Sequence, residues 1–217
     1  MPYGFLDIAN TPSVRRAQAE MGADHLWSEF KGHREFDSFG PKEAAFIAGR
    51  DSFYMASLSE TGWPYVQHRG GPTGFLKVID SKTLAFADYR GNRQYISTGN
   101  IAANARVSLF LMDYPHGTRL KIFATARQVA LDADPELTAA VTDTGYGAHL
   151  ERIFRLELAA FDWNCPQHIA PRFTETEVLS ATQPLRNRLA ELEQEVIQLR
   201  RRGTDNNQAA RDQGEPR

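Results

Sequence analysis

The stretch FADYRGNRQYISTGN, residues 86–100, decides how the rest of the chain is interpreted. A β-like run ends in Asp88 and Tyr89, and the Gly-Asn dipeptide at 91–92 predicts a turn. The pattern after the turn predicts a helix that begins near Arg93. Free backbone N–H groups at the start of such a helix favour an anion, so this corner is our first candidate binding site.

Two arginines flank the turn and strengthen this hypothesis. Arg90 and Arg93 would bring two guanidinium groups to the point at which the helix N-terminus is aimed. Together with the polar side chains of Asn92 and Gln94, they would suit a phosphate monoester. The alternative is a basic hairpin corner in solvent, because two arginines beside a Gly-Asn turn are common.

From Ser52 onward, short β-rich runs replace the helical pattern that precedes them. The runs SFYMASLSE and WPYVQHRG flank a Thr-Gly dipeptide at 61–62, which predicts a β-hairpin. Phe154, Leu156 and Leu158 alternate with charged residues, so one face of their strand is expected to be buried. Six or seven such strands with short turns predict a closed or nearly closed barrel, because closure removes the unpaired edges of a sheet.

The C-terminal part of the chain carries a heptad pattern. The spacing of Leu185, Leu189, Leu192, Val196 and Leu199 is 4, 3, 4, 3, which is typical of the apolar seam of a coiled coil. The helix either lies on its own barrel or faces a partner. We favour the partner because arginines and glutamates fill nearly every other position, although two heptads do not hold a dimer alone.

These patterns divide the chain into four parts. Pro41 is placed to open one of several amphipathic helices near the N-terminus, and the last residues have almost nothing to bury. The expected parts are an N-terminal helical segment at 1–50, a barrel at 51–175, a C-terminal amphipathic helix at 183–202 and a disordered tail at 203–217.

Composition excludes several classes of protein. The formal net charge of -2 draws the chain neither to nucleic acid nor to an anionic membrane. The longest apolar runs are far shorter than the roughly 20 residues of a membrane span, and the N-terminus does not resemble a signal peptide. One cysteine, Cys165, excludes an internal disulfide. We therefore expect a cytoplasmic protein.

Two further stretches are rich in unusual residues. QHRGGPTGFLK, residues 67–77, has three glycines that would let a flat ligand lie against the backbone, although a plain loop explains the composition equally well. In FDWNCPQHIAPRF, residues 161–173, Cys165 and His168 invite a nucleophile interpretation, but no residue to orient the base can be named. No metal site is expected, since His68 and His168 lack ligand spacing.

In order and spacing, these stretches resemble the pyridoxamine 5'-phosphate oxidase-like, FMN-binding split-barrel superfamily, and within it an uncharacterised oxidase-related branch. The family's phosphate-binding corner has a Gly-Ser-Arg-Lys type sequence, which residues 91–94 match. The preceding strand, which presents its backbone to the flavin ring and ends in a lysine, matches residues 74–77. The resemblance implies a mainly β (α+β) fold, a six- to seven-stranded split β-barrel with flanking helices and a C-terminal coiled-coil-like helix.

The resemblance also implies a homodimer with a shared flavin site. Arg119 matches a position from which the partner subunit contacts the ring, and Arg119 or Lys121 would favour the anionic reduced flavin. Trp163 and Arg172 resemble the tryptophan and arginine that close the family's sequence. The full set of candidate FMN ligands is Arg69, Gly74, Phe75, Leu76, Lys77, Asp88, Tyr89, Arg90, Asn92, Arg93, Gln94, Arg119, Lys121, Trp163 and Arg172.

One departure from the family bears on the substrate. True pyridoxamine phosphate oxidases close with an Arg-x-His pair that grips the substrate, whereas this chain has His168-Ile169-Ala170 there. We therefore expect an FMN-dependent oxidoreductase that acts on another small molecule. The alternatives are a flavin or haem storage protein of the same fold, and a barrel whose coil recruits a partner.

Overall fold

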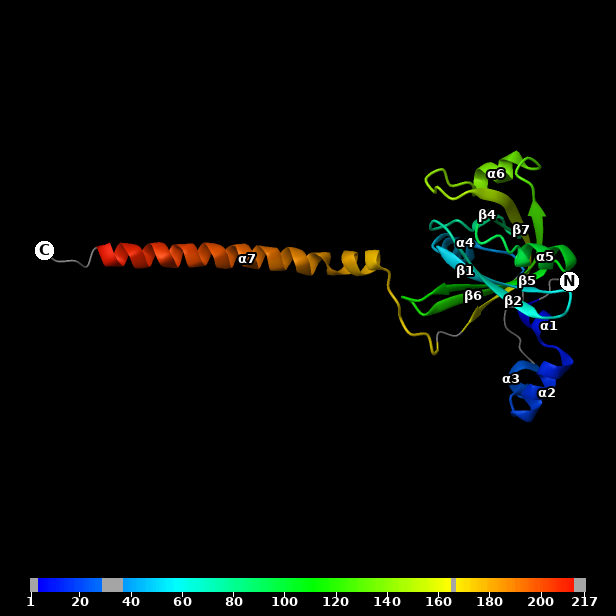
Figure 1. Cartoon of the computed structure of the whole chain (residues 1–217). Helices are drawn as coiled ribbons and strands as arrows, with labels where there is room; N and C mark the ends of the chain where they lie inside the picture. The colour runs from blue at the N-terminus through cyan, green and yellow to red at the C-terminus, as the bar shows by residue number, and fades with distance from the viewer. Residues whose placement is uncertain (1–3, 29–36, 165–166, 213–217) are drawn as a thin grey trace. The chain divides into compact units, whose positions relative to one another are not determined.

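The structure is a computed structural model that describes residues 4–28, 37–164 and 167–212. The chain forms two compact units, Met1–Ala170 and Pro171–Arg217, which are considered separately. The elements, labelled in Figure 1, are α1 (Phe5–Ala9), α2 (Pro12–Glu20), α3 (Asp24–Ser28), α4 (Pro41–Ala48), β1 (Ser52–Leu58), β2 (Pro64–Gly70), β3 (Lys77–Asp80), β4 (Thr83–Tyr89), α5 (Ile96–Ala103), β5 (Arg106–Asp113), β6 (Thr118–Val129), α6 (Pro135–Val141), β7 (Leu150–Asn164) and α7 (Glu175–Asp212).

The first unit contains a seven-stranded antiparallel sheet in the order β2-β1-β5-β6-β7-β4-β3. Strands β2 and β3 are the two ends of this order, and within the described residues they do not pair with each other. The sheet curls but does not close, so the expected six- to seven-stranded split β-barrel is confirmed.

The predicted hairpin at 61–62 is confirmed as the connection between β1 and β2. Leu58 pairs with Pro64, and Gly62 takes a left-handed conformation with φ 85°. Glycine tolerates this conformation because it has no Cβ atom. The hairpin makes β2 an edge strand whose alternate residues face opposite sides of the sheet.

The core lies on both faces of β4. Leu84 and Phe86 join the large apolar cluster inside the barrel, whereas Ala85 and Ala87 pack on the other face beneath α6. Burial of both faces explains why the strand reads as a continuous apolar run. It also fixes the strand's polar end, from Asp88 onward, at the barrel's rim.

Helix α4 begins at Pro41, as predicted, and contacts the C-terminal end of β7. The Glu43 carboxylate accepts hydrogen bonds from the Gly40 N–H at 3.0 Å and from Trp163 Nε1 at 2.8 Å. The indole ring also meets Phe46 edge to face. Trp163 is therefore held by α4 within its own chain.

Helix α7 is longer than the sequence indicated. It starts at Glu175 and not at 183, because Thr174 Oγ1 accepts from the Glu177 N–H while the Glu177 carboxylate accepts from the Thr174 N–H. It runs through Pro184 to Asp212, past the expected boundary at 202; residues 213–217 lie outside the described residues, and the disorder of the tail stays a prediction. Extending an existing helix is easier than nucleating one, which explains the longer span.

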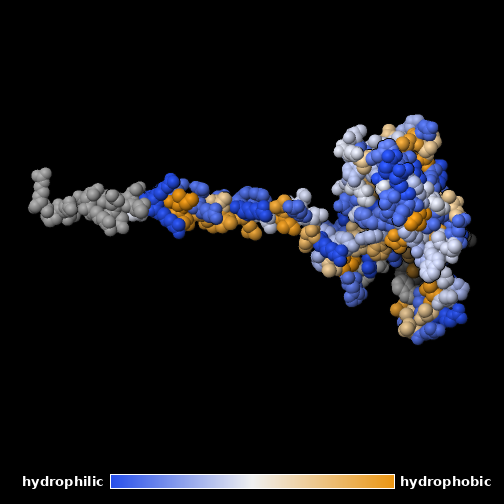
Figure 2. Space-filling model, in the orientation of Figure 1, coloured by the Kyte–Doolittle hydropathy of each residue, from blue (hydrophilic) through white to orange (hydrophobic). Residues whose placement is uncertain are grey.

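The described helices include none with both the length and the apolar character that crossing a membrane requires. Figure 2 shows α7 as a polar helix with a broken stripe of apolar side chains.

Candidate functional site

A cavity of about 210 Å³ lies where the predicted corner meets the edge strand β2. Strand β2, the end of β4, the loop after it, the first turn of α5 and one residue of β7 form its walls. The lining residues are Tyr65, Gln67, Arg69, Asp88, Tyr89, Gly91, Asn92, Arg93, Gln94, Tyr95, Ile96, Ser97, Thr98 and Glu151.

The loop at 90–95 reaches the cavity through two left-handed residues. Arg93 has φ 63° and Tyr95 has φ 52°. Side chains with a Cβ atom adopt this region at a cost, and such strain gathers at functional sites. It also explains why α5 begins at Ile96, three residues later than the expected start near Arg93.

The N-terminus of α5 points unsatisfied donors into the cavity. The side chain of Tyr95, the residue before the helix, accepts no hydrogen bond from the first turn. The backbone N–H groups of that turn lack intrahelical acceptors and carry partial positive charge. Ser97, in the same turn, is 4% exposed, and its Oγ atom has no hydrogen-bond partner within the described part of the chain.

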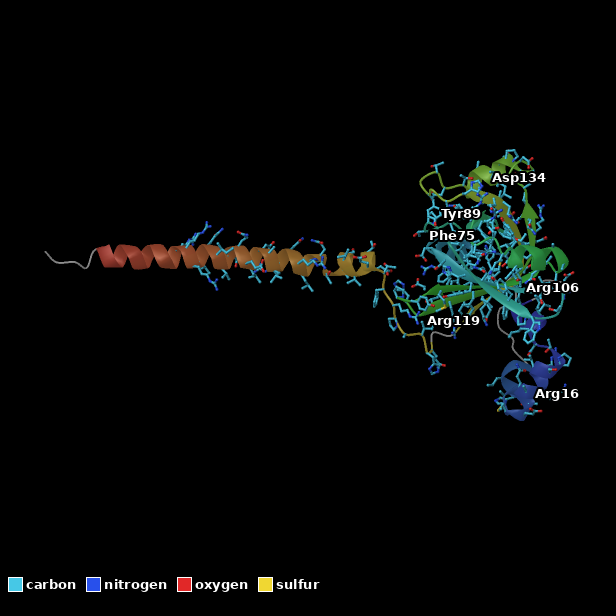
Figure 3. The ribbon with its side chains drawn as sticks, in the orientation of Figure 1. Arg16, Phe75, Tyr89, Arg106, Arg119 and Asp134 are labelled. Carbon is cyan, nitrogen blue, oxygen red and sulfur yellow. The ribbon has the colours of Figure 1, made fainter. Side chains whose placement is uncertain are left out.

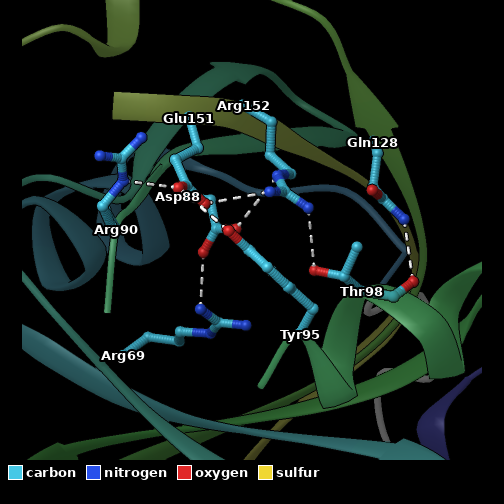
Figure 4. Close-up of polar contacts among 8 residues, drawn as sticks. All are labelled: Arg69, Asp88, Arg90, Tyr95, Thr98, Gln128, Glu151 and Arg152. Atoms are coloured by element: carbon cyan, nitrogen blue, oxygen red, sulfur yellow. Dashed lines mark hydrogen bonds and ion pairs between the residues drawn. The ribbon is translucent and has the colours of Figure 1, made fainter. Parts of the chain in front are cut away.

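The opposite wall is a buried ion-pair network (Figure 4). Arg69 donates to Asp88 Oδ1 at 2.7 Å, and Arg152 Nε lies 3.6 Å from Asp88 Oδ2. Burial raises the pKa of the Asp88 carboxyl, and the guanidinium groups of Arg69 and Arg152 oppose this rise. Arg152 also pairs with Glu151 at 3.0 Å, so its charge is shared between two carboxylates.

One Arg69 atom is left unsatisfied. Arg69 Nε is buried and, among the described residues, has no hydrogen-bond partner. A buried N–H donor without an acceptor costs free energy. An anion in the cavity would supply that acceptor.

The second carboxylate of the site, Glu151, holds one of the predicted phosphate ligands. It accepts from Arg90 Nε at 2.8 Å, from the Tyr95 hydroxyl at 3.1 Å and from Arg152 at 3.0 Å. The hydrogen bond from Arg90 is the main cause that lowers the pKa of the Glu151 carboxyl. Arg90 is therefore already engaged.

Arg93 differs from Arg90 in this respect. It lines the cavity from an exposed position and, within the described residues, makes no ion pair. Asn92 and Gln94, also in the predicted set, are joined by a 3.1 Å bond from the Gln94 N–H to Asn92 Oδ1. The loop thus holds its own shape and leaves the Arg93 guanidinium available.

Tyr89 also meets the cavity, from the end of β4. Its hydroxyl is buried and has no partner among the described residues, and its ring lies edge to face with Tyr146. Burial, followed by the nearby Asp143 and Tyr146, raises the pKa of Tyr89. The phenol is accordingly a hydrogen-bond donor and not an anion near neutral pH.

The glycine-rich stretch has a packing role in this chain. A Cβ atom on Gly74, which has φ 77°, would lie 3.0 Å from the Ala48 carbonyl oxygen, and one on Gly71 would clash with Phe75. The Phe75 and Leu76 side chains are buried in the core. Only the backbone of this segment is suited to face a flat ligand, and its contact with a ring stays a prediction.

Four of the remaining predicted ligands do not line the cavity: Lys77, Arg119 (labelled in Figure 3), Lys121 and Trp163. Arg119 and Lys121 are on β6, where Lys121 pairs with Asp162 at 2.9 Å, and none of these residues lines the cavity. Lys77 begins β3 and is half-buried. Arg172 belongs to the second unit, so its relation to the site is not defined.

The structure does not test the interpretation of Cys165 and His168 as a nucleophile and its base. Cys165 lies outside the described residues, and His168 takes a left-handed conformation with φ 62°.

Several residues of the site were missed in the sequence. Tyr65 and Gln67 share the two-residue period of β2 with Arg69, which is a readable pattern. Arg152 faces Asp88 only because β4 and β7 pair in that register. The sequence carries no signal for that pairing across more than sixty residues.

Comparison with known proteins identifies the family. The family model of pyridoxamine 5'-phosphate oxidase matches residues 39–162, whereas no protein of curated function matches the sequence. Similar solved structures include an FMN-binding protein from Syntrophomonas wolfei (11% identity, TM-score 0.45, 70% of this chain and 95% of that chain) and general stress protein 26 from Bacillus anthracis (12%, 0.43, 60% and 92%). Another is the haem storage protein HutZ from Vibrio cholerae (18%, 0.38, 54% and 88%).

The family match spans more than half of the 217 residues and contains all seven strands except the last residues of β7. The chain belongs to the pyridoxamine 5'-phosphate oxidase family.

Proposed function

We propose that the protein binds FMN, with the FMN phosphate in the cavity at the start of α5, and that it works as an FMN-dependent oxidoreductase on a small molecule. The observation that carries the proposal is the convergence of unsatisfied donors on one cavity. Ser97 Oγ and Arg69 Nε lack hydrogen-bond partners in the described structure, and the first turn of α5 has no side-chain cap. Arg93 brings a cation that makes no ion pair among the described residues. A phosphate monoester supplies several acceptor oxygens and two negative charges.

Different residues would make different contacts with FMN. Arg93 and the N–H groups of α5 would hold the phosphate, and Ser97 would donate a hydrogen bond. Asp88 holds Arg69 and Arg152 in place from behind. FMN is favoured over FAD because the corner ends at a phosphate site and the chain has no dinucleotide glycine fingerprint.

We also propose that the ring site is completed by a second copy of the chain. Tyr54, Leu58 and Val66 are 39–61% exposed on the outer face of β1 and β2. Next to them, an apolar cavity of about 430 Å³ lies over β1, β5 and β6. An exposed apolar face of this kind on an edge strand fits a partner. Because Tyr65, Gln67 and Arg69 lie on the other face of β2, the cavity and the dimer face share one strand.

When bound, the flavin supplies hydride chemistry, and the protein supplies position and charge. Arg119 or Lys121 of the second copy would place positive charge near the ring and favour its anionic reduced form. The family's Arg-x-His substrate grip is replaced by His168-Ile169-Ala170. We therefore do not assign pyridoxamine phosphate as the substrate.

The test is reconstitution of the purified protein with FMN, riboflavin and FAD, each followed by titration of flavin fluorescence. FMN should bind more tightly than riboflavin, since only FMN carries the phosphate, and Arg93→Ala should remove most of that difference. Equal affinity for FMN and riboflavin would contradict the phosphate site. Anaerobic reduction with NAD(P)H or a reduced deazaflavin then separates an oxidoreductase from a storage protein.

A further inference from the structure

Helix α7 carries an apolar seam longer than the leucine pattern first indicated. Val178, Leu185, Leu192 and Leu199 recur every seven residues, and Thr182, Leu189 and Val196 fall between them. The six apolar side chains of this seam are 41–73% exposed (Figure 2). Three heptads of exposed apolar residues on one helix face need a partner to exclude water.

The helix is also a poor one by itself. Pro184 lies in its interior and removes one backbone hydrogen bond, and Gly203 follows a run of three arginines. In the heptad, Pro184 falls on the outer face, away from the seam. Apolar packing along the seam can therefore stabilise the helix and offset the unfavourable effects of Pro184 and Gly203.

We propose that α7 forms a parallel, in-register, two-stranded coiled coil with α7 of a second copy of this chain. In heptad terms, leucine occupies three of the four d positions, and a β-branched residue occupies two of the three a positions. This combination favours parallel two-stranded coils. The seam then runs from Val178 to Leu199 and ends before Gly203.

The charges beside the seam agree with this pairing. In the parallel coil, Arg188 faces Glu193 of the second copy, and Glu195 faces Arg200 of the second copy. By two-fold symmetry this gives four attractive pairs and no repulsive one at these positions. Arg188 at present pairs with Glu191 of its own chain at 2.9 Å on the helix surface, a contact of little energy.

An antiparallel alignment with Leu189 against Leu192 of the second copy gives different neighbours. There, Arg188 faces Glu195 and Arg186 faces Glu193 of the other chain, so the charges are again opposite. The composition of the seam disfavours this arrangement. The two orientations predict different outcomes for one pair of charge reversals.

Cysteine cross-linking of the full chain tests the contact itself. In a Cys165→Ser background, Leu192→Cys should form an interchain disulfide readily, because the parallel coil places the two copies of residue 192 together. Gln194→Cys, on the outer face of the same turn, is the matched control and should cross-link slowly. This comparison is independent of barrel dimerisation, which is the same in both variants. Equal rates for the two variants, or cross-linking only in a mixture of Leu189→Cys and Leu192→Cys chains, would overturn the proposal.

Charge reversal in the Leu192→Cys background tests the orientation without any further change in the seam. Arg188→Glu and Glu193→Arg should each reduce the Leu192→Cys cross-linking equilibrium by about fivefold, the effect of two surface pairs turned repulsive. The double variant should restore it in the parallel coil, where the two reversed charges face each other and attract again. In the antiparallel coil both changes stay repulsive, so failure of the double variant to recover would contradict the proposal. Glu191→Gln removes the intrahelical pair alone and should leave cross-linking unchanged.

Discussion

Arg69 and Asp88 form a 2.7 Å ion pair between strands that stand near opposite ends of the sheet. Arg69 lies on the edge strand β2 and Asp88 on β4, with four strands between them in the sheet order. The side chains are 17% and 7% exposed. A side-chain pair, and not a backbone ladder, thus joins the two ends of the split barrel at the cavity.

Arg69→Met should therefore destabilise the protein. It would leave Asp88 buried with Arg152 at 3.6 Å as its remaining cation. We expect a loss of about 2 to 3 kcal/mol in the free energy of unfolding, below the full cost of an unpaired buried charge. Urea denaturation measures it, and Arg90→Met, which breaks a half-exposed pair with Glu151, should cost less than about 1 kcal/mol. Equal losses for the two variants would contradict a special role of the buried pair.

The raised pKa of Asp88 predicts a pH dependence of stability. Because the folded state holds the Asp88 proton more tightly than the unfolded state does, ionisation of this group costs stability as pH rises above its ordinary value of 3.8. The free energy of unfolding of wild type minus that of Asp88→Asn should therefore fall as the pH rises above 3.8. Arg69→Met should steepen this fall, since it removes an opposing charge. A difference that rises with pH would show that the two arginines outweigh burial.

We predict that Arg93 binds the FMN phosphate and that its left-handed backbone conformation lowers the stability of the protein. Arg93→Ala and Arg93→Gly both remove the guanidinium group and should weaken FMN binding by about 1.5 to 3 kcal/mol, the scale of a lost charge-assisted hydrogen bond. Only glycine accepts φ 63° without cost, so the glycine variant should be about 1 kcal/mol more stable than the alanine variant. Thermal melting and flavin titration measure the two effects. Equal stability of the two variants would show that the left-handed conformation is not maintained.

Ser97→Ala separates binding from folding in the same site. The buried Oγ atom lacks a partner in the described structure without ligand, so its removal should leave the ligand-free protein equally stable or more stable. FMN binding should weaken by about 1 kcal/mol, because the hydroxyl would donate to the phosphate. A less stable ligand-free variant would mean that Ser97 already has a structural partner.

The sequence predicted those parts of the site that depend on local pattern. The corner at 86–100 could be read because a strand end, a Gly-Asn turn and two arginines follow one another along the chain. The start of α5 was misplaced because left-handed φ values at Arg93 and Tyr95 have no sequence signature. Neither residue is a glycine or an asparagine, the residue types that usually mark such a conformation.

The other contacts that the sequence did not predict depend on pairing between segments that are distant along the chain. Arg152 meets Asp88 through the register of β4 and β7, and Trp163 meets Glu43 through the packing of α4 on the barrel. The glycines of residues 70–74 make room for the Ala48 carbonyl and Phe75, which the sequence did not indicate, and their contact with a flavin ring stays a prediction. Composition shows that a close approach occurs there but not which group approaches.

The last prediction concerns assembly and uses the fact that β2 faces both the cavity and the proposed dimer face. Val66 is 61% exposed on the outer face, between Tyr65 and Gln67, which line the cavity. In a chain truncated after Thr174, which lacks α7, Val66→Arg should disrupt the dimer, because it would bury an arginine in the apolar dimer face without a counter-charge.

The truncated chain without this substitution is the control, and it should stay dimeric and bind FMN like the full chain. If the flavin site is shared, the Val66→Arg monomer should lose FMN affinity even though every residue of the phosphate cavity is unchanged. Light scattering gives the assembly state, and flavin titration gives the affinity. A Val66→Arg monomer that binds FMN as tightly as the control would show that one chain builds the whole site, and Arg119 and Lys121 would then have no role at the ring.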